Sequence, residues 1–307
     1  MAERIATVTE LRPGYAGVGI DPDPVVVRCT APDALSNLVA VLELAADGQV
    51  RCGAASRYPS ASAVKLIEDV LVAGDYYEGG EPIAAFAWPL LILTAGLAQL
   101  AGNRLELTPR GRAVLAGPGY PALGALWARW LRSVSTDELS RIEAIKGQRR
   151  PSTLTPAVGR RAAVAAALAA LEPGVWTDIE DLFWLLRTRR PPLVAARSLM
   201  ALWRLYIADS YYGSLGHAGH RAWGIVEGRY ALCVLFEYAA TAGLIDVAYA
   251  GPCGARDDYR VLWGADQYAY LSRYDGLVAV RVNRLGAAIL HDPGALPGIG
   301  LPVPRRG

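Results

Sequence analysis

Lysine and cysteine are scarce in this chain, and each shortage narrows what the protein can be. Only two of its 31 basic residues are lysine. That excess of arginine, together with abundant alanine, is typical of a GC-rich coding sequence, so it is not by itself a sign of phosphate binding. The four cysteines lie far apart and include no CxxC pair. We therefore expect free thiols in a reducing cytoplasm rather than a disulfide framework or a zinc ribbon.

Motifs of several common activities are also missing. The chain has no GxxxxGK[ST] string, so it is not the motor of a helicase, and it has no GxSxG nucleophile elbow. Its first residues, MAERIATVTELRPGY, carry charges and lack the apolar core of a secretory signal. The sequence favours a cytoplasmic binding protein over an enzyme, without a cofactor or a metal, although it leaves the question of an enzyme open.

One apolar run, residues 82–101, approaches the length of a membrane span. It contains Pro89 and Gln99, and it follows an amphipathic segment as the second helix of a helix-turn-helix does. We predict a buried helix here and no contact with a membrane.

The length of 307 residues suits two or three domains, and 53% hydrophobic residues supply buried cores for them. We predict a mainly α fold with small β-wings, of the α+β class. The predicted segments are an N-terminal arm (1–32), a first module (33–118), a basic helical connector (119–172), a second module with an aromatic wing insert (173–290), and a Pro/Gly-rich tail (291–307).

Two segments of the chain end in the same way. Residues 97–115 read LAQLAGNRLELTPRGRAVL, and residues 244–290 run from LIDVAYA to YLSRYDGLVAVRVNRLGAAIL. In each, an apolar helical run passes into a strand, a turn, a second strand with alternating apolar residues, and a glycine-centred entry into a last helix. A winged helix closes in this way, so the pattern predicts two winged-helix modules in tandem.

Local signals place further elements in both modules. The first module is preceded by an edge strand at PVVVRCT and begins with a helix from Asp33 and a short strand QVRC. A helix capped by Ser60 or Ser62 follows, and then a recognition helix IAAFAWPLLILTAGL and a wing that turns at Gly102–Asn103. The second has a capping box from Thr177 to Glu180, a helix LVAARSLMALWRLYIADSYYG and a last long helix IVEGRYALCVLFEYAATAGL.

The closing string of the first module carries a family resemblance. NRLELTPRGRAVLAG resembles the closing strand and helix of winged-helix domains attached to DNA helicases and found in bacterial DNA-binding proteins, in which LTPxGRxxL is frequent. The match covers 15 residues, and VRVNRLGAAIL in the second module is a weaker echo of it. The resemblance implies binding to duplex or junction DNA, or a role in packing and protein docking.

The recognition helices themselves argue against reading base sequence. Major-groove recognition needs Arg, Lys, Asn or Gln on the inserted helix, and residues 83–97 contain no basic residue. The second helix has only Glu227 and Arg229 at its start and is apolar afterwards. We therefore expect the first helix, with Trp88, to be buried in an interface.

Positive charge is concentrated in the predicted connector. Residues 119–172 hold 8 basic and 4 acidic side chains, against 6 and 9 in residues 33–118 and 12 and 11 in residues 173–290. Such clusters supply sequence-independent affinity for nucleic acid, although a solvated helical face is the alternative. The predicted nucleic-acid contacts are Arg141, Lys146, Arg149, Arg150, Arg160, Arg161, Arg187, Arg189, Arg190, Arg256 and Arg260.

The insert of the second wing is rich in aromatic residues. Tyr259, Trp263, Tyr268, Tyr270 and Tyr274 alternate with Arg256, Arg260 and Arg273 in a predicted hairpin. Aromatic faces stack on unpaired bases while arginines follow phosphates, and the same composition suits a protein interface or an ordinary packed sheet face. The predicted partner-binding residues are Trp88, Trp263 and Tyr268.

A few residues could carry chemistry. His217 and His220 lie three apart, and Cys253, Asp257 and Asp258 follow in the next loop. These residue types bind zinc, but their spacing is not that of a zinc finger, so we predict loop histidines and no metal. Asp257, Asp258 and Glu227 are candidate acids or bases without a specified partner.

Three functions remain open at this point. The leading hypothesis is a non-catalytic protein that binds duplex, forked or single-stranded DNA as an accessory of a DNA-processing or defence machine, with a helicase or nuclease as partner. The alternatives are a scaffold that docks proteins through its apolar recognition helices, and a base-excision enzyme built on winged helices.

Overall fold

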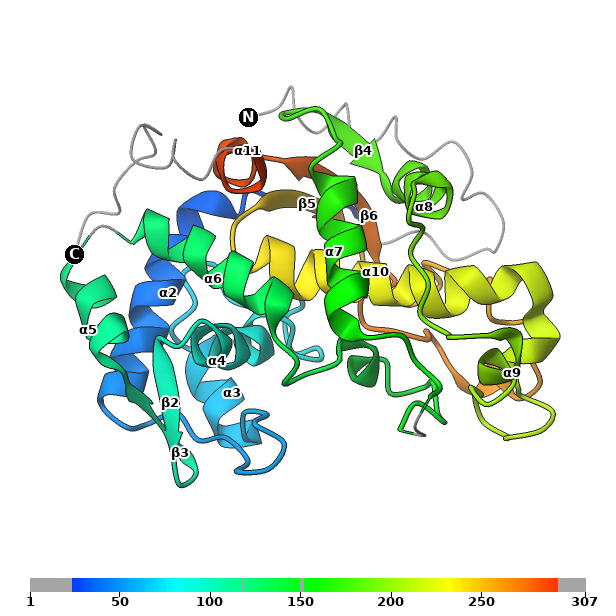
Figure 1. The fold of residues 1–307 in the computed structure, drawn as a ribbon, viewed down its shortest axis with the longest axis horizontal. Coiled ribbons are helices and arrows are strands. Elements are labelled where there is room, and N and C mark those ends of the chain that lie inside the picture. Colours follow the sequence, from blue (N-terminus) through cyan, green and yellow to red (C-terminus); the bar gives the residue numbers. More distant parts are fainter. Residues whose placement is uncertain (1–23, 118, 150–151, 292–307) are drawn as a thin grey trace. The chain divides into compact units, whose positions relative to one another are not determined.

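A computed structural model gives the structure of residues 24–117, 119–149 and 152–291 (Figure 1). Over these residues the chain is a mixed α+β protein in which helices predominate and small antiparallel sheets join them. The predicted fold class is thus confirmed at this level. The arm before residue 24, the tail after residue 291, and Arg150 lie outside the described residues. No helix in the described part has both the length and the hydropathy to span a membrane.

Contacts divide the chain into two compact units, each assembled from separate stretches of sequence. The described parts of unit 1 are 24–28, Thr136–Leu235 and Val247–Arg281. Those of unit 2 are Cys29–Ser135, Phe236–Asp246 and 282–291. These units cut across the predicted consecutive modules, because the end of the second predicted module is shared between them.

Unit 2 begins with the elements predicted for the first module, followed by one helix of the predicted connector. The elements of the module are α2 (Ala31–Ala46), α3 (Ala61–Glu68), α4 (Ala84–Thr94), β2 (Ala98–Ala101), β3 (Arg104–Leu107) and α5 (Pro109–Ala116), and the connector helix is α6 (Tyr120–Arg132). Ser60 caps α3 by accepting a hydrogen bond from the Ala63 N–H at 3.2 Å, as predicted. The wing hairpin also forms as predicted, with its turn at Gly102–Asn103. Helix α2 starts two residues before the predicted Asp33, which lies in its first turn.

The short QVRC segment joins this hairpin from the side of β3. Arg51 bridges Arg104 in antiparallel fashion, and the Leu105 N–H donates to the Val50 carbonyl at 2.9 Å. Along the chain the first module therefore reads helix, strand segment, helix, helix, strand, strand, helix, with its first strand segment paired to its last strand.

Helix α4 is the core of this region. Every residue from Ala84 to Ile92 is buried, including Pro89, and Trp88 has no exposed surface. The first N–H groups of a helix have no partner within the helix. Here the carboxylate of Asp75 accepts from the N–H groups of Ile83, Ala84 and Ala85 at 2.9–3.0 Å. The prediction of a buried helix is confirmed, and its amino end is occupied by the chain's own carboxylate.

Unit 1 holds shorter helices and longer connections. Its elements are η1 (Glu138–Arg141), α7 (Ala157–Leu168), β4 (Trp176–Asp178), α8 (Ile179–Thr188), α9 (Leu199–Leu202), η2 (Leu215–Arg221), η3 (Gly224–Gly228), α10 (Arg229–Cys233) and η5 (Ala265–Gln267). Asp178 caps α8 through the Glu180 N–H at 2.7 Å, so the predicted capping box headed by Thr177 is wrong by one residue. The helical turns that begin in η3 continue through η4 (Val234–Ala240).

Two sequence predictions fail in unit 1. Only Leu199–Leu202 is helical within residues 193–213, because Ser198 starts a single helical turn and the chain then folds back on itself between Ile207 and Gly213. The aromatic insert is not a hairpin either. It runs as turns around η5, pinned by side-chain contacts rather than by a ladder of backbone hydrogen bonds.

A four-stranded antiparallel sheet has the order β1 (Val26–Arg28), β5 (Ile245–Tyr249), β6 (Leu277–Val282) and β4. The predicted edge strand at PVVVRCT is confirmed as β1, which pairs with β5 from Val26–Tyr249 to Arg28–Val247. Strand β4 pairs with β6 on the other side. When the connector helix α7 is counted with the second module, its main elements are α7, β4, α8, the helical run 224–240, β5, β6 and α11 (Arg284–His291), with α9 and η2 inserted after α8 and η5 between β5 and β6. Apart from these insertions the order is that of the first module, and the first strand again pairs with the last.

The first of the two closing segments is held by one threonine. Thr108 receives the Gly111 N–H at 3.2 Å and donates its hydroxyl to the Gly96 carbonyl at 2.8 Å, while its own N–H donates to the Leu97 carbonyl at 3.0 Å. Gly96 has φ +67°, a conformation that glycine adopts at little cost. A Cβ on Gly111 would lie 2.1 Å from the Leu97 oxygen, so this position requires glycine.

The second closing segment has the same bonds with asparagine in place of threonine. Asn283 accepts from the Gly286 N–H at 3.0 Å and donates its amide to the Gly243 carbonyl at 2.9 Å, and its N–H donates to the Leu244 carbonyl at 3.3 Å. Gly243 has φ +80°, and a Cβ on Gly286 would lie 1.9 Å from the Leu244 oxygen. The similarity of the two sequence endings is therefore a similarity of structure.

Replacing Trp88 by alanine tests the core of unit 2. The indole is fully buried, so we expect Trp88→Ala to lower the free energy of unfolding by about 3–5 kcal/mol, measured by urea denaturation. Trp184 on α8 is 66% exposed, and Trp184→Ala should change the same quantity by less than about 0.5 kcal/mol. Equal stability of the two variants would show that α4 is not a core helix.

Candidate nucleic-acid interface

The structure buries three of the arginines that the charge pattern predicts as nucleic-acid contacts. Arg141, Arg160 and Arg161 are 8%, 2% and 0% exposed. Arg161 donates from Nε and Nη2 to one carboxylate oxygen of Glu138, at 3.0 and 2.6 Å, and from Nη2 to the Thr136 carbonyl at 2.7 Å. Arg160 pairs with Asp137. Both the predicted nucleic-acid contacts and the alternative of a solvated face are wrong for these residues, because Arg160 and Arg161 on α7 and Arg141 in η1 are buried.

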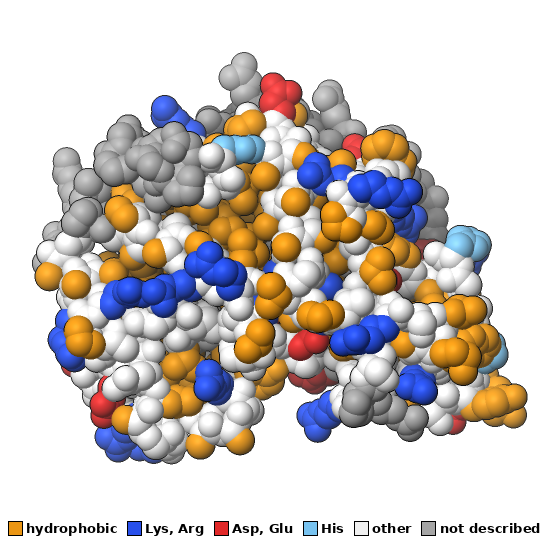
Figure 2. Space-filling view, in the orientation of Figure 1, with side chains coloured by type: hydrophobic (Ala, Val, Ile, Leu, Met, Phe, Trp, Pro, Cys, Tyr) orange, Lys and Arg blue, Asp and Glu red, His pale blue; other side chains and the backbone are white. Residues whose placement is uncertain are grey.

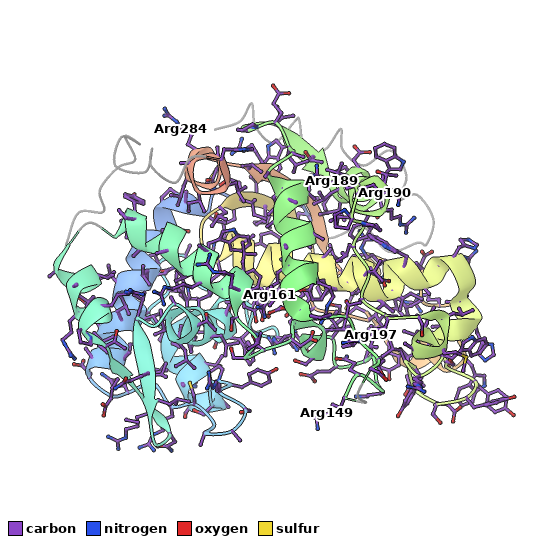
Figure 3. All side chains as sticks on the ribbon, in the orientation of Figure 1. Arg149, Arg161, Arg189, Arg190, Arg197 and Arg284 are labelled. Atoms are coloured by element: carbon purple, nitrogen blue, oxygen red, sulfur yellow. The ribbon has the colours of Figure 1, made fainter. Side chains whose placement is uncertain are left out.

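Of the other predicted contacts, Lys146, Arg149, Arg187, Arg190 and Arg260 are exposed, and Arg189 and Arg256 are partly buried. Arg187 lies over the Trp223 ring at 4.3 Å, and Arg256 pairs with Glu180 at 2.8 Å. Figure 3 shows Arg161 in the interior beside α7, Arg189 and Arg190 beside α8, and Arg149 at the lower margin of the view. The predicted set is therefore scattered, and only part of it can face a ligand.

Four exposed cations of unit 1 lie on neighbouring segments, and we call them the basic strip. They are Lys146, Arg149, Arg197 and Arg204. The backbone of Lys146 exchanges two hydrogen bonds with Tyr206, at 2.7 and 3.3 Å. A Cβ on the intervening Gly147 would lie 2.0 Å from the Arg204 carbonyl oxygen, so the two segments touch.

Arg197 belongs to the same group of segments. Its N–H donates to the Thr153 carbonyl at 3.0 Å and its Nε donates to the Leu154 carbonyl. Glu143, the nearest acidic residue along the chain from Lys146, is engaged by Arg273 at 3.5 Å. The sequence reasoning missed Arg197 and Arg204, because both fall in the stretch that it assigned to a continuous helix.

Next to the strip lies a group of exposed rings that we call the aromatic cluster, Trp203, Tyr211, Tyr212 and Trp263. Ring centroids of Tyr211 and Tyr212 are 5.1 Å apart, and those of Tyr212 and Trp263 are 5.8 Å apart. The His217 ring joins the group, 4.7 Å from the Trp203 ring and with Nε2 3.1 Å from the Tyr211 carbonyl. Figure 2 shows hydrophobic side chains gathered over the region of α9, with Lys and Arg side chains beside them.

The predicted partner-binding residues fare differently. Trp263 is 58% exposed and belongs to the aromatic cluster, whereas Trp88 is fully buried and cannot meet a partner in this structure. Tyr268 is partly buried, and its carbonyl accepts the Tyr259 hydroxyl at 3.1 Å. Tyr259 and Tyr274 have no exposed surface, so these two rings of the aromatic insert belong to the core.

Arg229 anchors this insert to the helical run. Its guanidinium binds both oxygens of Asp275, at 3.0 and 3.3 Å, and pairs with Asp258. Burial lowers the pKa of Arg229, but the charges of Asp275 and Asp258 more than offset this and raise it. Asp275 also accepts from the N–H groups of Leu271 and Ser272. Asp258 is therefore a structural partner of Arg229 rather than a free acid or base.

Glu227 is the other buried acid of this helical run. Its Oε1 accepts from the Ala195 N–H at 2.8 Å and the Ala196 N–H at 3.4 Å. Burial raises the pKa of the carboxyl, an effect that these two N–H groups and Arg160 partly oppose. The side chain fixes a loop to the helix and faces backbone groups, which is not the setting of a general acid on a substrate.

The candidate metal ligands do not come together. Among the described residues no group of three or more His, Cys, Asp or Glu side chains is placed to hold a metal ion. His217 faces Trp203, and Cys253 is an exposed free thiol.

Comparison with protein-family models, with curated proteins and with solved structures found no match to this chain. The site thus has to be judged from its own geometry.

Removing the Arg161 guanidinium tests whether the connector arginines are structural. Arg161→Ala leaves the buried Glu138 carboxylate without its cation, and we expect it to lower the free energy of unfolding by about 3–5 kcal/mol in urea denaturation. The exposed Arg190 serves as control, because Arg190→Ala should cost less than about 0.5 kcal/mol. Full stability of Arg161→Ala would mean that the ion pair is not formed.

The raised pKa of Glu227 predicts a pH dependence. The folded state binds this proton more tightly than the unfolded state, so the stability that the group contributes is fully present below its unfolded pKa and is lost as pH rises through its folded pKa. Glu227→Gln removes this loss. We expect the unfolding free energy of the variant, relative to wild type, to increase as pH rises above about 4, the ordinary range of a glutamate carboxyl. A pH-independent difference would contradict it.

Proposed function

We propose that this chain is a non-catalytic nucleic-acid-binding protein of two winged-helix modules, which holds the sugar-phosphate backbone at the basic strip and acts as an accessory of a DNA-processing or defence machine. The basic strip is the observation that carries the proposal. Lys146, Arg149, Arg197 and Arg204 are exposed on contiguous segments, and cations spaced in this way bind phosphates by releasing condensed counterions.

The tandem winged-helix architecture has support in the repeated order of elements. In both modules three helices and a strand segment precede a two-stranded wing, and the first strand segment pairs with the last strand. Both modules then close with a Thr or Asn cap that accepts a hydrogen bond from a glycine three residues later. At each of these glycines a Cβ would collide with a backbone oxygen. Two long-range solutions of the same kind favour a common architecture over coincidence.

The proposed binding does not involve base reading by the recognition helices. Helix α4 is buried from Ala84 to Ile92, and its amino end is capped by Asp75. In the second helical run Glu227 and Arg229 are buried and engaged as well. Base edges in the major groove require free donors and acceptors on the inserted helix, so the expected binding is independent of base sequence.

The two alternatives lose their main supports. A scaffold that docks proteins through apolar recognition helices needs those helices exposed, and both are buried within the described residues. A base-excision enzyme needs a carboxylate facing its substrate, whereas Asp258 is paired with Arg229 and Glu227 holds backbone N–H groups.

The test removes three cations of the strip and measures DNA binding against salt. Lys146→Ala, Arg149→Ala and Arg204→Ala are combined, and Arg197 is kept because its Nε binds the Leu154 carbonyl. Labelled single-stranded and duplex DNA of about 30 nucleotides is titrated between about 50 and about 200 mM NaCl. The variant should bind more weakly, and its log–log salt slope should fall by up to about one unit for each phosphate that it no longer neutralises.

A matched variant controls for loss of charge alone. Lys65→Ala, Arg129→Ala and Arg132→Ala remove the same residue types from exposed positions of unit 2 and should leave affinity and slope nearly unchanged. If both triple variants lose affinity equally, binding follows net charge and the strip is not the site. If wild type binds neither DNA at low salt, the proposed function is wrong.

A further inference from the structure

We propose that the aromatic cluster is a stacking platform for unpaired nucleotide bases, so that the ligand of the basic strip is single-stranded nucleic acid or an unpaired end. This inference rests on the proposed function and specifies its ligand. Three observations support it: the rings are exposed, the backbone holds them in place, and cations lie on the segments next to them.

The rings of the cluster are unusually exposed for their size. Tyr211, Tyr212 and Trp263 are 72%, 61% and 58% exposed, and Trp203 is 39% exposed. The planes of Tyr211 and Tyr212 meet at 88°. An edge-to-face pair covers one ring face at most, so the contact between these two rings leaves faces open on which a planar base can lie.

A tight loop presents the two tyrosines. One oxygen of Asp209 accepts from the N–H groups of Tyr211 and Tyr212, each at 2.8 Å, and these bonds lower the pKa of the carboxyl. The loop closes on itself, since the Gly213 N–H donates to the Asp209 carbonyl and the Ile207 N–H donates to the Gly213 carbonyl, both at 3.0 Å. A platform held by its own backbone loses little entropy when a ligand binds.

The base of the tyrosine loop, at Ala208, contacts the turn that carries Trp263. Ala208 has φ +53°, which is uncommon for a residue other than glycine or asparagine. The Ala208 Cβ lies close to Gly264, because a Cβ added to Gly264 would be only 2.8 Å from it. The loop 207–213 and the turn that carries Trp263 therefore touch at Ala208 and Gly264, which are 56 positions apart along the chain.

The cations next to the cluster indicate which kind of ligand it binds. Arg204 directly follows Trp203, Lys146 pairs through its backbone with Tyr206, and Tyr206 in turn bridges Ser214 at the end of the tyrosine loop. The segments that carry the strip and the cluster are thus adjacent. A ligand with planar rings and a regular negative charge satisfies both parts, and a strand with unpaired bases has both features.

Recognition at this platform should be tolerant of sequence. The Gln267 amide donates to the Gly264 carbonyl at 2.7 Å and the His217 ring is engaged with the Tyr211 carbonyl, so these side chains are not free to read base edges. Stacking alone distinguishes bases weakly, because every base has a π-face.

The experiment compares two single strands that differ only in their bases. Full-length protein is titrated with a labelled oligo-dT of about 20 nucleotides and with an abasic strand of the same length, which keeps the phosphates and lacks the rings. Wild type should bind oligo-dT more tightly. Tyr212→Ala and Trp263→Ala should each weaken oligo-dT binding by about tenfold and leave abasic binding and the salt slope unchanged.

Two controls keep the result interpretable. Trp184→Ala removes an equally exposed indole of unit 1 outside the cluster and should have no effect. Tyr212→Phe and Trp263→Phe keep an aromatic face and should retain most of the preference for oligo-dT. Circular dichroism and thermal unfolding verify that each variant is folded.

The inference and the proposed function fail in different ways. Equal binding of oligo-dT and the abasic strand by wild type, or an undiminished preference in both alanine variants, overturns the stacking platform while salt-dependent binding at the strip stands. Absence of binding to both single strands overturns the platform, and the proposed function fails as well if duplex DNA is not bound at low salt either.

Discussion

One turn of buried helix determines the arrangement of unit 1, because three of its polar side chains each need a distant partner. Glu227 accepts hydrogen bonds from the N–H groups of Ala195 and Ala196. Arg229 forms ion pairs with Asp258 and Asp275. Tyr230 donates its hydroxyl to Glu138 at 3.1 Å. A buried polar group without a partner destabilises the fold. This turn therefore ties three separate loop regions to a single helix.

The surface of the unit follows from those ties. The segment that Glu227 holds leads into Arg197, α9 and Trp203, and the segment that Arg229 holds carries Trp263. The segment at Glu138 leads on toward Lys146 and Arg149. Charges that are buried and paired thus position the charges and rings that remain exposed.

This separation changes how the wealth of arginine should be understood. A guanidinium needs several hydrogen-bond acceptors when it is buried, and Arg161 and Arg229 obtain them from carboxylates and backbone carbonyls. The arginines of the strip are exposed on segments that also carry Lys146. Among them, Arg197 also donates a hydrogen bond to the Leu154 carbonyl and so helps to hold two segments together. The first kind stabilises the fold, and the second kind is exposed to solvent.

The sequence by itself determined the elements whose causes are local. The wing turn at Gly102–Asn103, a serine cap at Ser60 or Ser62, the edge strand and the burial of α4 all follow from neighbouring residues, from glycine's freedom at positive φ, and from a run without charge. The likeness of the two closing segments was readable for the same reason, since the cap and the glycine lie three residues apart in each.

Only the tertiary structure decided which arginines are buried and which rings are exposed. Arg160 and Arg161 belong to a sequence that reads as a solvated connector, and Trp203, Tyr211 and Tyr212 belong to one that reads as a helix. Partners far along the chain, such as Glu138 for Arg161 and the turn at Gly264 for Ala208, reverse those predictions. The burial of single arginines and rings depends on the whole arrangement of the chain, whereas caps and turns depend on a few adjacent residues. Local signals could therefore place caps and turns to within one or two residues, and they could not show which arginines and rings are buried.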